Sequence, residues 1–339
     1  MEATTAEWSR LYEAAAQFKK LKPWEWLSNI HLFGVKDPKS QKIGYCCVMG
    51  NGGEMYGMAV YIGSAGLQTL LQMLNGDLMD VDPLFIQHCY MLSFDNREDL
   101  YPEEYAQMKQ LGLSYRGRNA WPTFRLYEPG YVPWPLNKSE DVVFLTHVIL
   151  QAIEVSLSYR AKPDVLLEWN GQIYLVRIPE KSAVASRWNW TSKWLKPEPD
   201  QPKEVHSKML LDEIRMAKAK RAVQHVVGVW EVDSFFVPMP IHEEGRPFYP
   251  KMNLIADEAS GQILHHGLTK QQEASPNLAE GLLKLIEEHK VVPSLLVSAN
   301  SKVLDELKPV IAGFGIHTQT VQETPSIEHF LQSIKEHMF

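Results

Sequence analysis

Three tryptophans and three basic side chains alternate within one short stretch of the sequence. They are Arg187, Trp188, Trp190, Lys193, Trp194 and Lys196. Because indole rings stack on bases and cations contact phosphates, this composition is typical of a surface that binds single-stranded nucleic acid. The alternative interpretation is a loop that its indoles anchor to the core.

Charge restricts this hypothesis to one part of the chain. The stretch 181–221 has ten basic and five acidic residues, whereas the whole protein has a net charge of −7. Sequence-independent binding to a phosphate backbone normally needs a basic surface, so the overall charge disfavours nucleic acid as a partner. A helix of solvated charges is the alternative for 204–224.

Histidines and cysteines offer little metal chemistry. His265-His266 lies near Asp257 across a predicted hairpin, but adjacent strand residues point to opposite faces, so at most one imidazole could join the carboxylate. Cys46 and Cys47 fail as a thiolate pair for the same reason. Three cysteines without a CxxC motif predict reduced thiols and a cytoplasmic protein.

The most glycine-rich run is Gly50-Asn51-Gly52-Gly53. A phosphate-binding loop would need a following Lys-Ser/Thr and a long helix, and the sequence has neither. We interpret the run as a hairpin turn. GxSxG and HExxH motifs are also missing from the sequence.

The length of 339 residues predicts two or three units, and 45% hydrophobic residues suffice for a sizeable core. We predict an α/β protein with an N-terminal domain at 1–120, a connecting region at 121–202 and a C-terminal domain at 203–339. No basic leader precedes an apolar run, and no window approaches eighteen consecutive apolar residues, so we expect no membrane partner.

The N-terminal domain should begin with a helix capped at Thr4. Three strands follow between His31 and Ile62, then a helix over 67–74, a strand over 89–94 and a helix over 103–111. The order is βββαβα, so a similar topology to the C-terminal domain, or an internal duplication, stays open.

The connecting region is rich in proline and aromatic residues. Residues 121–136 should be extended on a surface, and 141–157 should form an apolar helix. A hairpin of 165–169 and 173–178 is expected around Asn170-Gly171, and 186–202 is expected to be a loop.

The C-terminal domain shows the most informative order, βββαβαβα, with strands at 225–237, 251–257, 262–268, 294–298 and 316–321. Hairpins join antiparallel strands and helical crossovers join parallel ones, so this order predicts a mixed five-stranded sheet with helices on its faces.

Residues 226–339 resemble the integrase catalytic core of the ribonuclease H-like superfamily. Asp233 lies in Val229-Trp230-Glu231-Val232-Asp233 at the position of the family's first acid, and the stretch 254–261 resembles its second strand and hairpin, with Asp257 near the turn. The resemblance implies a two-metal nuclease, in which three acids must converge.

The second acid of that family is missing. Ala299 stands at its position, while Glu328 and Glu336 are both candidates for the third acid. Because alanine cannot bind a metal, the resemblance implies the fold and argues against the activity.

Segments over most of the chain also resemble an uncharacterised bacterial family. They are 21–26, 44–63, 121–136 and 245–250. This resemblance implies a bacterial origin and transfers no site.

Three functional hypotheses follow. The leading one is a cytoplasmic protein whose ribonuclease H-like domain is catalytically degenerate and retained for binding, with no cofactor. The second is a divergent nuclease that uses Asp233, Asp257 and Glu328 or Glu336 with Mg²⁺ or Mn²⁺. The third is a scaffold that binds a protein partner through the aromatic segment 121–136.

Overall fold

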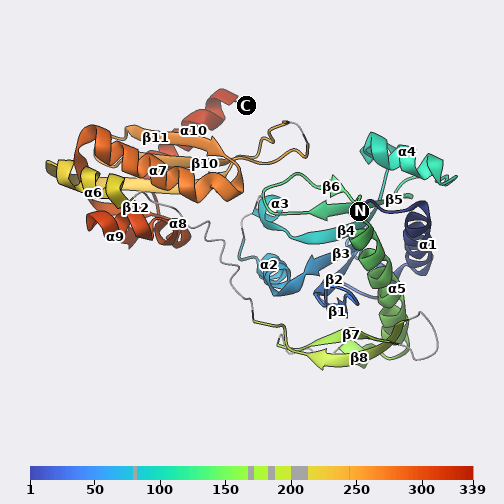
Figure 1. The fold of residues 1–339 in the computed structure, drawn as a ribbon. Helices are drawn as coiled ribbons and strands as arrows, with labels where there is room; N and C mark the ends of the chain where they lie inside the picture. The colour runs from blue at the N-terminus through green and yellow to red at the C-terminus, as the bar shows by residue number, and fades with distance from the viewer. Residues whose placement is uncertain (79–81, 167–171, 182–187, 200–212, 244, 339) are drawn as a thin grey trace. The chain divides into compact units, whose positions relative to one another are not determined.

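The computed structural model describes residues 1–78, 82–166, 172–181, 188–199, 213–243 and 245–338. The chain forms two compact units, unit 1 (Met1–Gln201) and unit 2 (Pro202–Phe339) (Figure 1). The division falls at the predicted boundary near residue 202. The predicted boundary at 120/121 lies inside unit 1, because 121–127 is strand β5 of its sheet, paired with β4.

Unit 1 is built on an eight-stranded sheet with the order β6-β5-β4-β3-β2-β1-β7-β8. All neighbouring strands are antiparallel except β1 and β7, which are parallel. The strands are β1 (Phe33–Lys36), β2 (Ile43–Met49), β3 (Gly57–Ile62), β4 (Cys89–Asp95), β5 (Trp121–Tyr127), β6 (Trp134–Pro135), β7 (Tyr174–Lys181) and β8 (Trp188–Leu195).

Helices cover both faces of this sheet. The longest pair, α1 and α5, share one hydrophobic core with the sheet, and α2 contributes to a second core on the opposite face (Figure 1). Cys46 belongs to the first core and Cys47 to the second, as strand alternation predicts. The helices are α1 (Thr5–Leu21), η1 (Pro23–Glu25), α2 (Gly63–Asn75), α3 (Asp82–Ile86), η2 (Arg97–Asp99), α4 (Pro102–Gln110), α5 (Ser139–Ala161) and η3 (Pro163–Leu166).

Local signals in the first half of unit 1 are confirmed. The capping box of α1 is formed by Thr4 and Glu7, with the Thr4 amide donating to Glu7 Oε2 over 2.8 Å. The glycine-rich run Gly50-Asn51-Gly52-Gly53 joins the antiparallel strands β2 and β3.

Helix α5 is long and apolar enough to span a membrane by length and composition. The sequence criterion of eighteen consecutive apolar residues did not detect it, because polar residues interrupt the helix. However, 56% of its most apolar stretch is buried inside unit 1. That burial is typical of the central helix of a soluble protein, and this helix is the core of unit 1.

The predicted hairpin of 165–169 with 173–178 is wrong. Leu166 ends the short helix η3, residues 167–171 lie outside the described part, and β7 pairs instead with β8. The predicted loop at 186–202 therefore contains a strand. Aromatic side chains favour strands, and the prolines that suggested a loop begin only at Pro197, after β8 has ended.

A similar topology for the two units is also wrong. In unit 1 the strand that follows β3 is β4, which pairs beside β3 in an antiparallel register, with Tyr61 opposite Cys89. Two helices, α2 and α3, bring the chain back to the end of the sheet that it left. A single helical crossover would have produced the parallel neighbour seen in unit 2.

Unit 2 contains the predicted mixed sheet of five strands, ordered β11-β10-β9-β12-β13. Strand β9 is antiparallel to β10 and parallel to β12. Helices α6 to α9 and α10 cover opposite faces. The elements are α6 (Glu213–Ala222), β9 (His225–Phe236), β10 (Lys251–Asp257), β11 (Ile263–Thr269), α7 (Gln271–His289), β12 (Val291–Ser298), α8 (Ser301–Glu306), α9 (Lys308–Phe314), β13 (His317–Thr320) and α10 (Pro325–Met338).

The crossover between β12 and β13 is split into α8 and α9 rather than forming one helix. Pro309 lies in the first turn of α9, where its missing amide hydrogen is tolerated, and it could not continue α8.

Candidate functional site

The predicted tryptophan and lysine surface divides between two faces of the β7–β8 hairpin. Trp190 and Trp194 pack against the core that α5 helps to form, and the Trp190 ring centroid lies 5.9 Å from that of His147 in α5. Lys193 lies at an alternate position, is exposed, and its Nζ is 3.8 Å from Glu180 Oε1. The indoles and this cation therefore point in opposite directions.

Among the described residues, the rest of the predicted tryptophan and lysine surface does not form a continuous patch with Lys193. Trp188 is partly buried at the start of β8, and Lys196 is exposed just beyond its end. Arg187 lies outside the described residues. Base stacking by this set stays a prediction, and the anchoring role of the indoles is the one that their contacts support.

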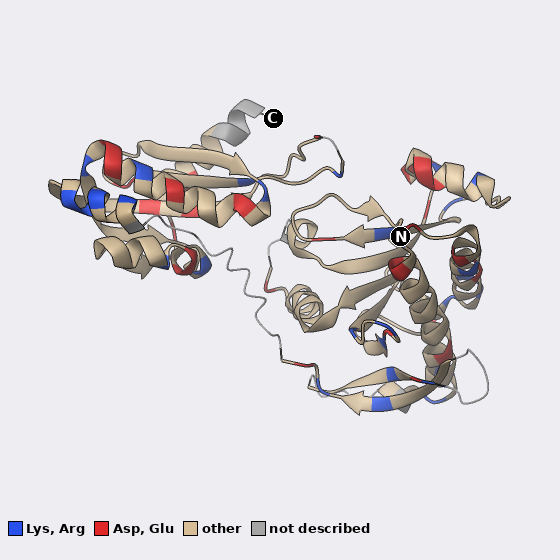
Figure 2. Ribbon diagram, in the orientation of Figure 1, with Lys and Arg blue, Asp and Glu red and all other residues tan. Residues whose placement is uncertain are grey.

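The basic helix in the predicted stretch, α6, packs along α7, and Figure 2 shows both signs of charge on these two helices. Arg215 forms ion pairs with Glu280 at 2.9 Å and with Glu287 at 2.6 Å. This cation therefore already has acidic partners within unit 2.

Of the four candidate nuclease acids, the structure describes the side chains of Asp233, Asp257 and Glu328. These three do not assemble into one site, and no group of three or more described His, Cys, Asp or Glu side chains could hold a metal ion. Asp233 pairs with Leu254, which faces α10, whereas Asp257 pairs with Trp230, which faces α7. The two carboxylates thus lie on opposite faces of the sheet.

Two of these acids are occupied in local structure. Asp257 Oδ1 accepts from the backbone amide of Ser260 at 2.9 Å and from its hydroxyl at 2.7 Å. Glu328 Oε1 accepts from the Thr324 amide at 3.1 Å. The side chain of Glu336 lies outside the described residues.

Asp233 is the one candidate that keeps an unusual electrostatic setting. Burial raises the pKa of its carboxyl, against the lowering effects of the Ser234 amide hydrogen bond and of Lys251. The parallel register of β9 and β12 pairs Glu231 with Val297, and β12 ends at Ser298, one residue before Ala299.

Glu231 is the acid that we did not single out from the sequence. Its side chain is fully buried and accepts hydrogen bonds at the first turn of α10, from the amides of Ser326 (3.0 Å) and Ile327 (3.0 Å) and the Ser326 hydroxyl (3.1 Å). The partial positive charge of a helix N-terminus stabilises such a carboxylate. A lone glutamate inside an apolar strand was the available signal.

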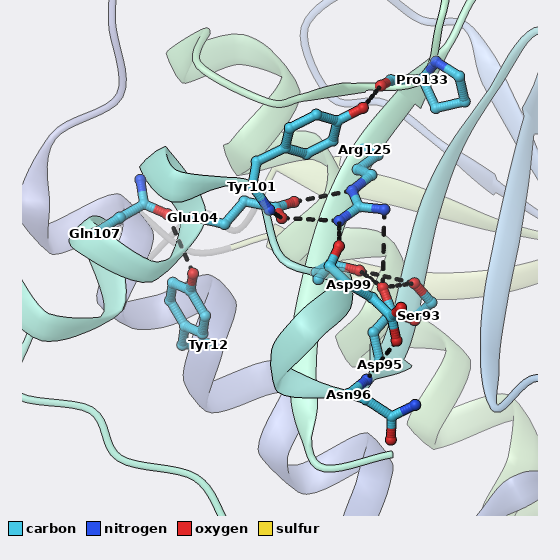
Figure 3. Close-up of polar contacts among 11 residues, drawn as sticks. Tyr12, Ser93, Asp95, Asn96, Asp99, Tyr101, Glu104, Gln107, Arg125 and Pro133 are labelled. Atoms are coloured by element: carbon cyan, nitrogen blue, oxygen red, sulfur yellow. Dashed lines mark hydrogen bonds and ion pairs between the residues drawn. The ribbon is translucent and has the colours of Figure 1, made fainter. Parts of the chain in front are cut away.

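The aromatic segment 121–136 forms β5 and β6 of the unit 1 sheet rather than a surface connection. Figure 3 shows how Arg125 of β5 ties α4 to this sheet. Its guanidinium donates to both carboxylate oxygens of Glu104, at 3.0 and 2.8 Å, and to the carbonyl of Asp99 at 2.7 Å. Binding of a protein partner by this segment stays a prediction.

The same network fixes the end of β4. Asp95 Oδ2 accepts from the hydroxyls of Ser93 at 3.1 Å and Thr123 at 2.7 Å. Beside it, Asn96 Oδ1 accepts from the backbone amide of Asn119 at 3.1 Å (Figure 3 shows Asn96). These bonds hold the segment that precedes β5 against the end of β4.

A cavity of about 550 Å³ lies next to this junction, and no sequence motif predicted it. Four segments of unit 1 line it: the end of α1 with η1, the β2–β3 turn, the end of β4 and residues 118–119. Its volume is within the range of ordinary ligand sites, about 300–1,000 Å³.

Three cations line this cavity against one carboxylate. They are Lys19, Lys22 and Arg118, and the acid is Glu25. Lys22 is paired with Glu25, with 3.4 Å between Nζ and Oε1. Arg118 is exposed and forms no ion pair with any residue that the structure describes.

Lys19 is held in place without an acidic partner among the described residues. Its Nζ donates to the carbonyl of Asn119 at 2.7 Å and lies 5.1 Å from the centroid of the Phe94 ring. Burial lowers the pKa of this ammonium group. A nearby anion would favour its charged form.

Aromatic rings form the other side of the cavity. The centroid of Trp24 lies 5.3 Å from that of Tyr56 and 5.9 Å from that of Phe94. Gly50 permits this packing, since it has a φ of 130° and an added Cβ would lie 2.8 Å from the Tyr56 ring and 2.9 Å from Trp24.

Comparison with known families matches both units. A family model described as "Domain of unknown function (DUF7309)" covers residues 8–177, half of the chain. The chain belongs to the DUF7309 family. A second model, "Domain of unknown function (DUF6930)", matches residues 215–335 within unit 2. No curated protein and no solved structure matches the chain.

Every residue that lines the cavity lies within the DUF7309 match. The cavity is thus a feature of the DUF7309 part of the chain. Its lining residues are spread from Lys19 to Asn119, so no contiguous motif could have announced it. The only local signal was the glycine-rich run, which we interpreted as a turn; it is a turn, and it also lines the cavity.

Proposed function

We propose that unit 1 binds a small anionic ligand in the cavity between α1, the β2–β3 turn and residues 118–119. The observation that carries this proposal is the charge of the lining: three cations face one carboxylate, in a chain whose net charge is −7. A local excess of positive charge in a concave site concentrates anions against the overall charge of the protein.

Solvated lysines at a helix end are the simplest alternative interpretation. Lys19 argues against it, because its ammonium is partly buried, fixed by the Asn119 carbonyl and placed over the Phe94 ring. A solvated lysine would avoid that desolvation by extending into water. Charge-assisted hydrogen bonds from Lys19 and Arg118 would recover the lost hydration when an anion binds.

The test is calorimetric titration of the full chain with pyrophosphate at low and high salt. We expect saturable binding that weakens with salt, and a loss of affinity of about 10-fold or more in Arg118→Ala, because hydrogen bonds to charged groups contribute about 1.5–3 kcal/mol. Arg116→Ala is the matched control, since Arg116 is an exposed arginine two residues away that does not line the cavity. No binding, or equal losses in both variants, would refute the proposal.

For unit 2 we propose the catalytically degenerate ribonuclease H-like binding module that the sequence predicts, in a cytoplasmic bacterial protein without a resident metal. Supporting observations are the strand order, in which the first strand pairs with the second and the fourth, and the parallel register of Glu231 with Val297, which brings the end of β12 close to Asp233. The alternative is the divergent nuclease that uses Asp233, Asp257 and Glu328 or Glu336.

A cleavage assay on DNA and RNA with Mg²⁺ or Mn²⁺ separates these two functions. We expect no cleavage by the wild type, because a two-metal mechanism needs convergent carboxylates. Metal-dependent cleavage that Asp233→Asn abolishes would establish the nuclease instead.

A further inference from the structure

The anion cavity of unit 1 has one aromatic ring with surface left for a ligand. Trp24 and Phe94 are only 8% and 3% exposed, because they pack against each other and the core. Tyr56 is partly exposed and also lines the cavity, with its ring centroid 5.3 Å from that of Trp24. A planar group in the cavity would therefore meet Tyr56.

The β2–β3 turn keeps the space beside Tyr56 open. A Cβ added to Gly52 would meet nothing within 4 Å, and one added to Gly53 would meet only the Tyr56 hydroxyl, at 4.0 Å. Asn51, the one residue with a side chain in the run 50–53, has its amide directed at Trp24 and donates to the Trp24 carbonyl at 3.4 Å. The turn thus borders the ring without covering it.

We propose that the ligand is a mononucleotide, whose phosphate binds Lys19 and Arg118 and whose base stacks on Tyr56. This inference rests on the proposed anion binding and adds the class of ligand. Phosphate alone would use the cations and leave the aromatic side of the cavity empty. Base–aromatic stacking with phosphate contacts by Lys and Arg is the chemistry by which proteins hold nucleotides.

The backbone around Tyr56 supports a fixed ring. The Tyr56 carbonyl accepts from the Phe94 amide at 2.9 Å, which joins the start of β3 to the end of β4. This bond survives a change of side chain, so Tyr56 variants test the ring and keep the strand pairing. Tyr56→Phe retains the stacking face, and Tyr56→Leu removes it while filling most of the space.

The experiment compares AMP, ribose 5-phosphate and adenosine in calorimetric titrations of the full chain. We expect AMP to bind about 10-fold more tightly than ribose 5-phosphate, because only AMP has a base that stacks on Tyr56; this ratio corresponds to about 1.4 kcal/mol. Adenosine alone should bind more weakly than AMP. Tyr56→Leu should lower AMP affinity to that of ribose 5-phosphate and leave ribose 5-phosphate unchanged, and Tyr56→Phe should bind both as the wild type does.

Two outcomes would overturn the inference and leave the proposed function standing: equal affinities of the wild type for AMP and ribose 5-phosphate, or an AMP preference that persists in Tyr56→Leu. Failure of pyrophosphate and ribose 5-phosphate to bind would instead remove the proposed anion binding itself. Near-ultraviolet circular dichroism of each variant verifies that the fold is retained.

Discussion

The two units treat their charged side chains differently. In unit 2, the buried Glu231 accepts hydrogen bonds from the Ser326 and Ile327 amides at the start of α10, and Arg215 is paired with two glutamates. In unit 1, Arg125 and Glu104 form a similar pair, but Lys19 and Arg118 line a cavity and have no acidic partner in the part of the chain that the structure describes. Closed networks stabilise a fold, whereas charges left without a partner in a concave site indicate a ligand.

The largest effect that this comparison predicts concerns the closed network of unit 1. Arg125→Leu should destabilise unit 1 by about 4 kcal/mol, because Glu104, only 6% exposed, would be left as an uncompensated buried charge. Urea denaturation followed by circular dichroism measures the change. Arg10→Leu, at an exposed position of α1, is the control and should change stability little. A loss below about 1 kcal/mol would show that Glu104 does not depend on Arg125 for charge compensation, as is usual for an exposed ion pair.

The corresponding change in unit 2 is Glu231→Ala. It should cost about 3 kcal/mol, because it leaves the Ser326 and Ile327 amides without their acceptor in a buried place. The unfolding transition of unit 2 in the full chain is the measurement, with the exposed Glu258→Ala as control. If both variants unfold at the same urea concentration, the carboxylate does not cap α10.

A change at the open site should lower binding and spare the fold. Lys19→Met should weaken pyrophosphate binding about 10-fold, through loss of a charge-assisted contact. Burial lowers the pKa of Lys19 below 10.5, so the unfolded state binds the proton more strongly than the folded state. The contribution of Lys19 to the free energy of unfolding therefore increases as pH rises toward 10.5. Lys19→Met should remove that pH dependence. A marked loss of stability at pH 7 would assign Lys19 a structural role instead.

The smallest expected effect lies at Asp233. Because burial raises its pKa above 3.8, the folded state holds the proton more strongly, and stability falls as pH rises through that window. Asp233→Asn should therefore be slightly more stable than the wild type at pH 7, with the difference vanishing below about pH 4. Thermal melting at both pH values measures it. Lower stability of the variant at pH 7 would mean that the charged carboxylate has a stabilising partner.

Elements with strong local signals were predictable. The capping box fixed the start of α1, and hairpin and helix periodicity gave all five strands of unit 2 in their order. The segment 188–195 was not predicted as a strand, because its tryptophans were interpreted together with the prolines that follow, and that composition suggested a loop. Strand β8 pairs with β7 in the folded protein. The sequence had instead favoured a hairpin partner for 173–178 on the other side of Asn170-Gly171, so this pairing could not be predicted locally.

The sequence by itself determined the α/β class and the mixed five-stranded sheet of unit 2, because these depend on periodicity and connection length. Only the tertiary structure decided which groups the charged side chains contact. Glu231 meets α10 across 95 residues of chain, and Lys19 meets the carbonyl of Asn119 across 100. The candidate site is assembled from segments that lie far apart in the sequence. Its cations and aromatic rings therefore come together only when the chain folds, and no contiguous motif contains them.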